Sequence, residues 1–249
     1  METKQPVKKA LVMGATSGIG KEVAHLLAMK GWQLALAGRR IDVLRQLQSE
    51  WPGIRAVAQI DLTDSQAPTL IRQLIDSMGS IDLYFHSSGI GFQNVALDPE
   101  KEERTVATNA VGFTRALTAV FNHCTSDPSQ PLHIAVISSI ARTKGLGAAP
   151  AYSATKRFQS HYVEGLQQLA AIRRLPVTFT DVRPGFVDTA LIEGSDFPLK
   201  LQPARVARQI VRAVERRRSV VTIDWRYRLL VAAWRLVPRW LWVRLPIRR

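Results

Sequence analysis

A tyrosine, a lysine and a serine are spaced so that they could transfer a proton together. Tyr152 and Lys156 are four residues apart, which places them on the same face of a helix. Ser139 comes thirteen residues before Tyr152, at the end of an apolar run. A phenol has a pKa of roughly 10 and exchanges protons poorly at neutral pH unless a positive charge lowers that pKa. Lys156 would supply this charge, and Ser139 would donate a hydrogen bond to a substrate oxygen as negative charge develops there.

A glycine-rich segment near the start of the chain could bind a dinucleotide. It has the spacing G-x-x-x-G-x-G and lies between an apolar run and a segment of helical periodicity. Glycines let the backbone approach a pyrophosphate, whose negative charge is favourable at a helix N-terminus. The candidate binding residues are Gly14, Thr16, Ser17, Gly18, Ile19 and Gly20. The alternative is a tight turn whose small residues serve packing only. Together with the tyrosine motif, the turn predicts an oxidoreductase that pairs hydride transfer with proton transfer.

Two arginines indicate which nicotinamide cofactor is bound. NAD enzymes place an acidic residue about 20 residues beyond the glycines, where it binds the ribose hydroxyls. This chain instead has Gly38-Arg39-Arg40 after the second apolar run. Guanidinium groups match a ribose 2′-phosphate, which only NADP(H) carries. We therefore predict NADP(H) as the cofactor, with Arg39 as the main contact, and the alternative for Arg40 is simple exposure to solvent.

Apolar, β-rich runs alternate with segments of helical periodicity along most of the chain. The expected strands are Lys8–Met13, Gln33–Ala37, Ile54–Gln59, Ile81–His86, Leu132–Ser138, Val177–Val182 and Ser219–Asp224. The expected helices are Ile19–Lys30, Ile41–Trp51, Ser65–Met78, Pro99–His123, Ala151–Ile172 and Pro203–Arg217. This alternation predicts an α/β fold, a doubly wound parallel sheet with helices on both faces. We expect one Rossmann-like domain over residues 1–224 and a C-terminal amphipathic helical appendage over residues 225–249.

With its motifs in this order, the chain resembles the short-chain dehydrogenase/reductase family over residues 7 to about 190. The motifs that carry the resemblance are the Gly14/Gly18/Gly20 turn, Asp61-Leu62, Asn109, Ser138-Ser139, Tyr152-x-x-x-Lys156 and Arg183-Pro184-Gly185-Phe186-Val187-Asp188-Thr189. The resemblance implies that Asp61, with Leu62 beside it, meets the adenine. It also implies that the Pro184-Gly185 turn passes over the nicotinamide ring. Val187 and Thr189 would then bind the carboxamide of the nicotinamide.

The resemblance assigns further roles around the tyrosine. Lys156 would bind the nicotinamide ribose as well as act on Tyr152, and Asn109 would hold a water that links Lys156 to solvent. Spacing favours Ser139 over Ser138 as the catalytic serine, because Ser138 would be buried in the strand end. The remaining alternative is that Tyr152 and Lys156 are ordinary helix residues. None of these motifs calls for a metal.

The chain departs from the family at two places. The family usually has Asn-Asn-Ala-Gly after the fourth strand, whereas this chain has His86-Ser87-Ser88-Gly89. Gly89 is retained, so the backbone can still come close to the cofactor there. We interpret His86 as a hydrogen-bonding residue rather than a catalytic one. Arg142, where the family commonly has glycine, and Lys144 lie in the segment that would line the substrate pocket. Either could pair with an anionic substrate group, or both could be solvated loop charges.

The net charge of +14 is concentrated at the C-terminal end. Residues 205–249 contain 13 arginines, no lysine and two acidic residues, whereas residues 1–204 are nearly neutral, with 21 basic and 18 acidic residues. Four of the six tryptophans also lie in this end. Cys124 is the only cysteine, so the chain has no intramolecular disulfide and suits a reducing compartment.

Residues 225–243 have the periodicity of an amphipathic helix. One broad face is formed by Leu229, Leu230, Ala233, Leu236, Val237, Trp240 and Leu241, and Arg228, Arg235 and Arg239 lie opposite. The uncharged run 229–234 is far too short to span a membrane. Such a helix could lie on an anionic membrane surface, or it could pack on its own domain or on a partner subunit. Nucleic-acid binding is not expected, because the arginines are interleaved with bulky aliphatic residues.

The sequence as a whole predicts an NADPH-dependent carbonyl reductase or alcohol dehydrogenase acting on a small-molecule carbonyl or alcohol. We expect it in the cytoplasm, peripherally associated with the inner membrane surface. The family resemblance implies a homo-dimer or homo-tetramer formed through the helices over 99–123 and 151–172. The segment 191–202 would be the lid over the substrate pocket. The alternative is a non-catalytic regulator that binds NADP(H), which would have no need for an intact proton relay.

Overall fold

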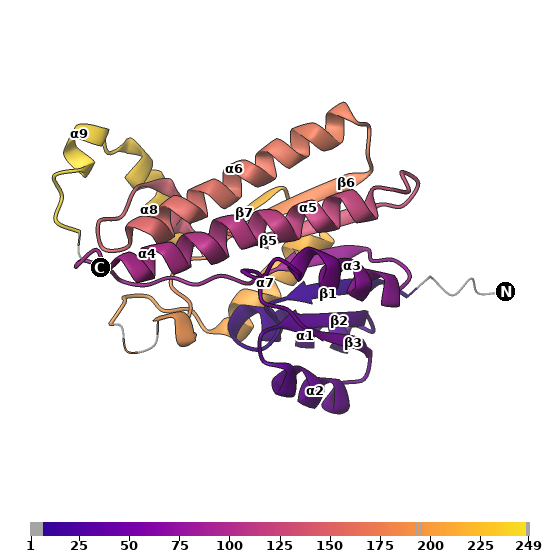
Figure 1. Ribbon diagram of the computed structural model, residues 1–249. Coiled ribbons are helices and arrows are strands. Elements are labelled where there is room, and N and C mark those ends of the chain that lie inside the picture. Colours follow the sequence, from indigo (N-terminus) through magenta and orange to yellow (C-terminus); the bar gives the residue numbers. More distant parts are fainter. Residues whose placement is uncertain (1–6, 193, 195, 248–249) are drawn as a thin grey trace.

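The protein folds around a single seven-stranded parallel sheet, seen in a computed structural model that describes residues 7–192, 194 and 196–247 (Figure 1). The strands are β1 Lys9–Met13, β2 Gln33–Gly38, β3 Ile54–Gln59, β4 Leu83–His86, β5 Leu132–Ile137, β6 Val177–Arg183 and β7 Val220–Thr222. Their order across the sheet is β3-β2-β1-β4-β5-β6-β7. The predicted doubly wound α/β fold is therefore confirmed. Positions 193 and 195 of the predicted lid, the first six residues and the last two lie outside the described residues.

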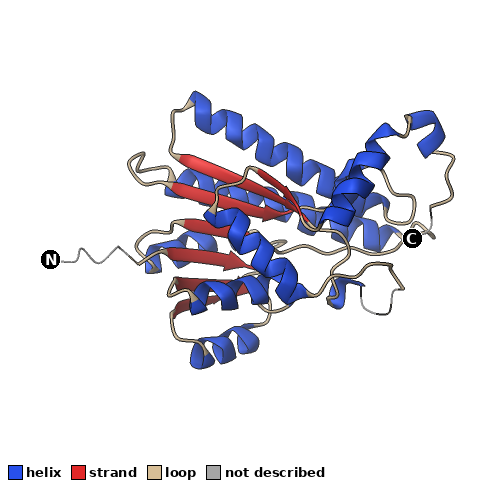
Figure 2. Cartoon of the chain, turned by 180° about the vertical axis from the view of Figure 1, so that it is seen from behind, coloured by secondary structure: helices blue, strands red, loops and turns tan. Residues whose placement is uncertain are grey.

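Helices cover both faces of the sheet (Figures 1 and 2). The helices are α1 Gly18–Met29, α2 Ile41–Glu50, α3 Ala67–Ser77, α4 Pro99–Val106, α5 Phe113–Cys124, α6 Pro150–Ile172, α7 Pro203–Glu215, α8 Trp225–Leu236 and α9 Arg239–Trp242. One buried cluster of apolar side chains joins the sheet to α1, α2, α7 and α8, and a second joins it to α3, α5 and α6. The strands contribute near-continuous buried runs to both clusters, as the sequence predicted.

The strand order reverses between β1 and β4, and this reversal decides where a ligand can bind. In open α/β sheets, the crevice at such a switch point opens at the carboxyl ends of the strands. The glycine turn follows β1, Ser87 to Gly89 follow β4, Ser139 follows the end of β5, and Pro184 follows β6. Motifs that are far apart in the sequence therefore lie at the same edge of the sheet.

The predicted long helix over 99–123 differs in the structure. It consists of α4, a π-helical turn over Ala107–Gly112 that contains Asn109, and α5. A π turn inserts one extra residue into a helix and is frequent at functional sites. A side chain on Gly112 would lie 2.7 Å from the carbonyl oxygen of Leu62, so glycine is what allows this turn to pack against the segment after β3.

The predicted C-terminal helix over 225–243 is also divided. Helix α8 ends at Leu236 and α9 begins after Pro238, because proline lacks the amide N–H and disfavours helical backbone at the preceding residue. The side of α8 that packs on the domain carries Tyr227 and Val231, which are buried, together with partly buried Leu230 and Trp234. This packing on the chain's own domain is one of the alternatives for the amphipathic segment. Most of the expected apolar face, Leu229, Ala233, Leu236, Trp240 and Leu241, is instead exposed.

Candidate active site

Tyr152, Lys156, Ser139 and Asn109 converge at the carboxyl edge of the sheet. The ammonium nitrogen of Lys156 lies 5.7 Å from the centre of the Tyr152 ring, and Tyr152 shares a side-chain hydrogen bond with Ser139. A side chain on Gly89 would lie 3.4 Å from Lys156 Nζ and 3.3 Å from Asn109 Oδ1. The structure thus brings together the four residues that the sequence singled out as catalytic.

The side chain of Tyr152 is partly buried. Burial raises the pKa of Tyr152, and the hydrogen bond with Ser139 acts in the opposite direction. The pKa of Tyr152 is thus raised, which is opposite to the lowering by Lys156 that the sequence led us to expect. Gly91 lies against the ring, since a side chain there would come within 2.5 Å of Tyr152 Cδ2. The backbone after β4 can therefore close over Tyr152 only because Gly91 has no side chain.

The amine of Lys156 is buried and held by two hydrogen bonds. Its Nζ donates to the carbonyl oxygen of Ile137 at 2.9 Å and to Oε1 of Gln159 at 3.0 Å. Burial lowers the pKa of Lys156 to about 8, and the negative charge of Asp181 opposes this lowering. Lys156 therefore changes charge close to neutral pH, which suits a group that relays protons.

Asn109 organises the π turn and the segment after β4. Its side chain donates to the carbonyl oxygen of Ile90 at 2.6 Å and accepts from the amide of Ile90 at 2.9 Å. Its backbone carbonyl accepts a hydrogen bond from Gln159 Nε2 at 2.9 Å. Gln159, which is fully buried, thus links Lys156 to Asn109. Sequence reasoning missed Gln159, although its position three residues after Lys156 places it on the same helix face.

Ser139 is oriented at the end of β5 by a short 3₁₀ turn over Ile140–Thr143. Its Oγ accepts a hydrogen bond from the amide of Ala141 at 3.1 Å, so the hydroxyl proton remains able to donate elsewhere. The neighbouring Ser138 is buried, as expected, and donates to Asp181 Oδ1. Asp181 also pairs with Arg183 Nη2 at 2.7 Å. Asp181 is a second residue near the site that the sequence analysis did not single out.

The glycine turn forms a close-packed cradle after β1. A side chain on Gly20 would lie 2.2 Å from the carbonyl oxygen of Gly14, and Gly14 itself has a φ of 87°, which favours glycine. The hydroxyl of Ser87 donates to the Gly14 carbonyl at 3.2 Å and ties the turn to the end of β4. Gly18, Ile19 and Gly20 begin α1, so backbone amides and the positive end of the helix face the crevice. This cradle fits a pyrophosphate.

Arg39 and Arg40 extend from the end of β2 beside this cradle. Both are exposed, and Arg40 Nη2 donates to Thr16 Oγ1 at 2.9 Å, so Arg40 reaches back to the glycine turn rather than pointing only into solvent. Burial would raise the pKa of Asp61, but hydrogen bonds from Thr63 and the charge of Arg39 hold it below its ordinary value. The two guanidiniums and one carboxylate form a mainly cationic edge, which fits a phosphate on the adenosine ribose.

Two predicted cofactor residues have structural roles that the sequence did not reveal. The side chain of Leu62 is buried in the core, so only its backbone can reach a cofactor. A side chain on Gly185 would come within 2.3 Å of the ring of Tyr227, which packs beneath the Pro184-Gly185 turn. The phenol of Tyr227 donates to the carbonyl oxygen of Leu199 at 3.0 Å and so joins α8 to the segment over the site.

Val187 and Thr189 follow this turn and approach the glycine cradle. Val187 is buried and pairs with Leu201 through an isolated β-bridge. A side chain on Gly18 would lie 3.1 Å from the Thr189 methyl carbon, so the two segments are in contact range. The segment expected to hold the nicotinamide carboxamide therefore lies against the turn expected to hold the pyrophosphate.

Three other polar residues that the sequence singled out occupy distinct places. His86 is completely buried against Tyr84, whose hydroxyl lies 2.8 Å from His86 Nδ1, and burial together with Lys156 lowers the pKa of His86 to about 3. His86 is therefore neutral at physiological pH. Partial burial, aided by Arg183, lowers the pKa of Arg142 to about 10, so Arg142 remains cationic. Lys144 is not a solvated loop charge: its Nζ donates to the carbonyl oxygen of Val237 at 2.7 Å.

Comparison with known proteins gives the same assignment as the site. The short chain dehydrogenase family model matches residues 8–196, and the chain belongs to this family of oxidoreductases. A protein of Myxococcus xanthus named as an uncharacterized oxidoreductase is 33% identical over 199 residues, which cover 77% of each chain.

Solved structures share the fold. An alcohol dehydrogenase from Thermococcus sibiricus complexed with 5-hydroxy-NADP has a TM-score of 0.76 and 22% identity, covering 89% of this chain and 98% of its own. A short-chain dehydrogenase/reductase from Burkholderia phymatum in complex with NAD has a TM-score of 0.78 and 18% identity, covering 91% and 92%. At these identities, both structures show that the fold is shared. Within the residues that the structure describes, no helix has the length and apolar character needed to cross a membrane.

Proposed function

We propose that the protein is an NADP(H)-dependent carbonyl reductase or alcohol dehydrogenase in which Tyr152 is the general acid and base. The observation that carries the proposal is the convergence of Tyr152, Ser139 and Lys156 beside a glycine cradle that fits a pyrophosphate. The bound nicotinamide would supply or accept the hydride. A carbonyl oxygen placed against Ser139 and Tyr152 would accept a hydrogen bond from the serine and a proton from the phenol.

The proton would return to Tyr152 through groups that the fold has already aligned. Lys156 lies beside the ring and would relay the proton, while Gln159 positions Lys156 by accepting a hydrogen bond from its amine and donating one to the Asn109 carbonyl in the π turn. A water held at Asn109 would complete the path to solvent. The buried ammonium of Lys156 would also stabilise the tyrosinate that forms when the phenol gives up its proton. In the oxidation direction, the same groups would remove the alcohol proton.

The preference for NADP(H) rests on the arginines beside the cradle. Arg40 contacts Thr16, and Arg39 acts on Asp61, so both cations lie where the ribose of a dinucleotide would sit. A 2′-phosphate would give them an anionic partner, which NAD lacks. The solved relatives that bind NAD or NADP share the fold and do not decide this preference.

Two exposed surfaces support proposals about partners. Val106, Val111, Phe158 and Leu169 are apolar and 38–47% exposed on the helices α4 to α6, which supports a homo-dimer or homo-tetramer formed through them. The C-terminal segment exposes apolar residues among arginines, which supports peripheral association with an anionic membrane surface from the cytoplasmic side.

The proposed reaction can be tested by following NADPH oxidation with a panel of aldehydes and ketones. We expect turnover of at least one carbonyl by the parent protein. We expect Tyr152→Phe to lose activity by about 100-fold or more, because general acid catalysis contributes on that order. NADPH binding measured by fluorescence would stay near the parental value in Tyr152→Phe, since the hydroxyl acts in chemistry. NADPH binding without turnover of any carbonyl would favour the non-catalytic alternative.

A further inference from the structure

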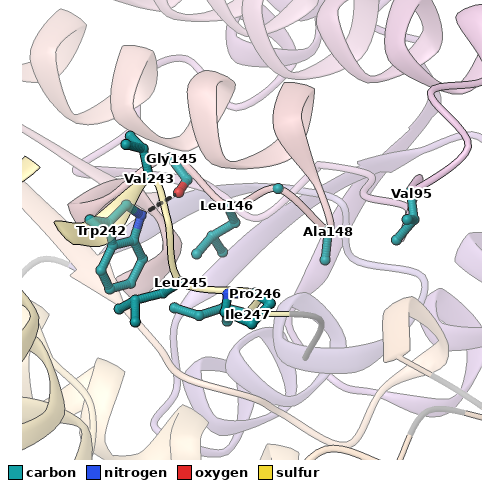
Figure 3. A pocket seen from close by; sticks show the side chains of 10 residues that line it. Val95, Gly145, Leu146, Ala148, Trp242, Val243, Leu245, Pro246 and Ile247 are labelled. Carbon is teal, nitrogen blue, oxygen red and sulfur yellow. Dashed lines mark hydrogen bonds between the residues drawn. The ribbon is translucent and has the colours of Figure 1, made fainter. Parts of the chain in front are cut away.

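The C-terminal tail and the loop before α6 line a half-open, mainly apolar cavity with a volume of about 360 Å³ (Figure 3). Its walls are Val95, the loop 145–148, and the tail residues Trp242, Val243 and 245–247. Figure 3 shows Leu146, Trp242, Leu245 and Ile247 grouped around the same space. None of the described residues that line it carries a charge, although the tail is otherwise rich in arginine. The lining therefore selects for an uncharged, apolar occupant.

The tail wall of this cavity is fixed in place by specific bonds. Trp242 Nε1 donates to the carbonyl oxygen of Gly145 at 2.7 Å, and only 8% of Trp242 is exposed. Lys144 Nζ donates to the carbonyl oxygen of Val237 at 2.7 Å, just before α9. Trp242 also meets Trp234 of α8 edge to face, with 5.5 Å between ring centroids. The tail is thus fixed to the loop before α6 at Val237 and at Trp242, and Trp242 also packs on α8.

The cavity borders the same two segments that enclose Tyr152. The amide of Asn94 donates to the carbonyl oxygen of Ala148 at 2.8 Å, which joins the segment after β4 to the cavity loop. In the first of these segments, Gly91 lies against the Tyr152 ring and Val95 lines the cavity. In the second, the loop leads through Ala148 directly into α6, where Tyr152 lies. Tyr152 does not itself line the cavity, but the two segments that flank Tyr152 also form one side of the cavity.

We propose that this cavity binds the aliphatic chain of the substrate, so that the preferred substrates are carbonyls or alcohols with a medium-length alkyl chain. The assignment rests on the proposed oxidoreductase function and adds a substrate class to it. The cavity volume lies within the range of roughly 300–1,000 Å³ that is usual for small-molecule sites. Each methylene buried in the cavity should tighten binding by about fourfold.

Gly147 offers a variant that fills the cavity without disturbing the fold. It lines the cavity, and a side chain added there meets no other atom within 4 Å. Its φ is not in the left-handed region, so a larger residue causes no backbone strain. Gly165 is a matched control: it also has open space around it, and it lies exposed on α6, outside the set of cavity-lining residues.

The test compares kcat/KM for the ketone series from 2-butanone to 2-decanone in the parent protein, Gly147→Leu and Gly165→Leu. We expect kcat/KM to rise at least tenfold along the series in the parent and in Gly165→Leu, and to stay nearly flat in Gly147→Leu. The value for 2-butanone should change by less than twofold in all three. An equal rise with chain length in Gly147→Leu and in the parent would overturn the proposal.

A binding measurement separates this proposal from the proposed reaction. Calorimetric titration of 2-decanone and 2-butanone into the parent and Tyr152→Phe should give at least tenfold tighter binding of 2-decanone in both. This difference should vanish in Gly147→Leu and persist in Gly165→Leu. If the protein turned over no ketone but showed this binding pattern, the reaction would be wrong and the cavity assignment would stand. Equal affinity of the parent for the two ketones would contradict the cavity assignment.

Discussion

At the scale of single residues, the proposed reaction would depend on the buried charge of Lys156 and on the exposed charges of Arg39 and Arg40. Lys156 is surrounded by protein, and its charged form is opposed by burial and favoured by Asp181. Arg39 acts on Asp61, and Arg40 binds Thr16 of the glycine cradle. The proposed cofactor preference and the expected pH dependence can therefore each be tested at an identifiable side chain.

Cofactor preference should change with Arg39. We expect the parent to bind NADPH at least tenfold more tightly than NADH, which corresponds to about 1.4 kcal/mol. Arg39→Asp should narrow or reverse this difference, because a carboxylate repels the 2′-phosphate and accepts hydrogen bonds from ribose hydroxyls. Dissociation constants from fluorescence titration, with Arg55→Asp as a control on the exposed part of β3, would measure it. Equal constants for NADPH and NADH in the parent would refute the assignment.

The pH dependence of carbonyl reduction should follow Lys156. Because the ammonium form exists below a pKa of about 8, kcat/KM should be constant at lower pH and fall as pH rises through that value. The charge of Asp181 raises this pKa, so Asp181→Asn should move the fall to lower pH. Exposed Asp127→Asn should leave the profile unchanged. A pH–rate profile that is identical in the parent and Asp181→Asn would show that Asp181 does not set the charge of Lys156.

Most residues that touch the centre of the site could be predicted from short motifs, whereas those that support it could not. Tyr152, Lys156 and Ser139 have a fixed spacing that can be recognised in the sequence. Asp181 and Gln159 gain their roles only when β6 and α6 come together beside the π turn. No local pattern distinguishes such buried polar residues from ordinary strand and helix positions.

At the scale of elements, the strands were the easiest to predict because each is a short, buried apolar run. Every expected strand appears with its end shifted by at most a few residues. The π turn at Asn109 was missed because one inserted residue barely changes the apolar periodicity of a long helix. The packing of Tyr227 beneath Gly185 was missed because those residues are 42 positions apart and meet only through the fold.

The helices α4 and α6 lie side by side on one face of the molecule (Figures 1 and 2). Both helices expose apolar residues. Phe158, which is 40% exposed and stacks on Tyr162, is the most bulky of them. If this face joins two copies of the chain, Phe158→Glu should convert the oligomer to monomer by burying an unpaired charge at the interface. Sedimentation velocity would measure the mass, with Met29→Glu, exposed on α1, as the control. A parent protein that sediments as a monomer would exclude the interface.

At the scale of the whole molecule, charge and exposed apolar surface are gathered at the C-terminal end. The predicted amphipathic segment divides its residues: Tyr227 and Trp242 pack on the domain, whereas Leu229, Leu236 and Trp240 are 61–84% exposed. Hydrophobic periodicity alone could not decide which apolar residues would be buried, because two stripes of apolar residues share one short helix. Pro238 then separates α8 from α9.

The exposed apolar residues Leu229, Leu236 and Trp240 lead to a prediction about membrane binding. We expect the full-length protein to sediment with vesicles containing anionic lipid, and to dissociate as salt rises, since the arginines contribute through screened electrostatics. Leu236→Glu and Trp240→Glu should each weaken binding, while Met29→Glu, a comparably exposed position on α1, should not. Equal recovery of parent and variants with anionic and neutral vesicles would rule out this surface as a membrane contact.

The central claim is that Tyr152 supplies the proton that accompanies hydride transfer from a nicotinamide cofactor whose pyrophosphate lies in the glycine cradle. It can be measured directly with NADPH deuterated at the transferring position, mixed with 2-octanone in a single turnover and analysed by mass spectrometry. The parent should place deuterium on the carbinol carbon of the product. Tyr152→Phe should bind the cofactor with near-parental affinity and transfer deuterium at least about 100-fold more slowly. Deuterium transfer at the parental rate in Tyr152→Phe would contradict the account.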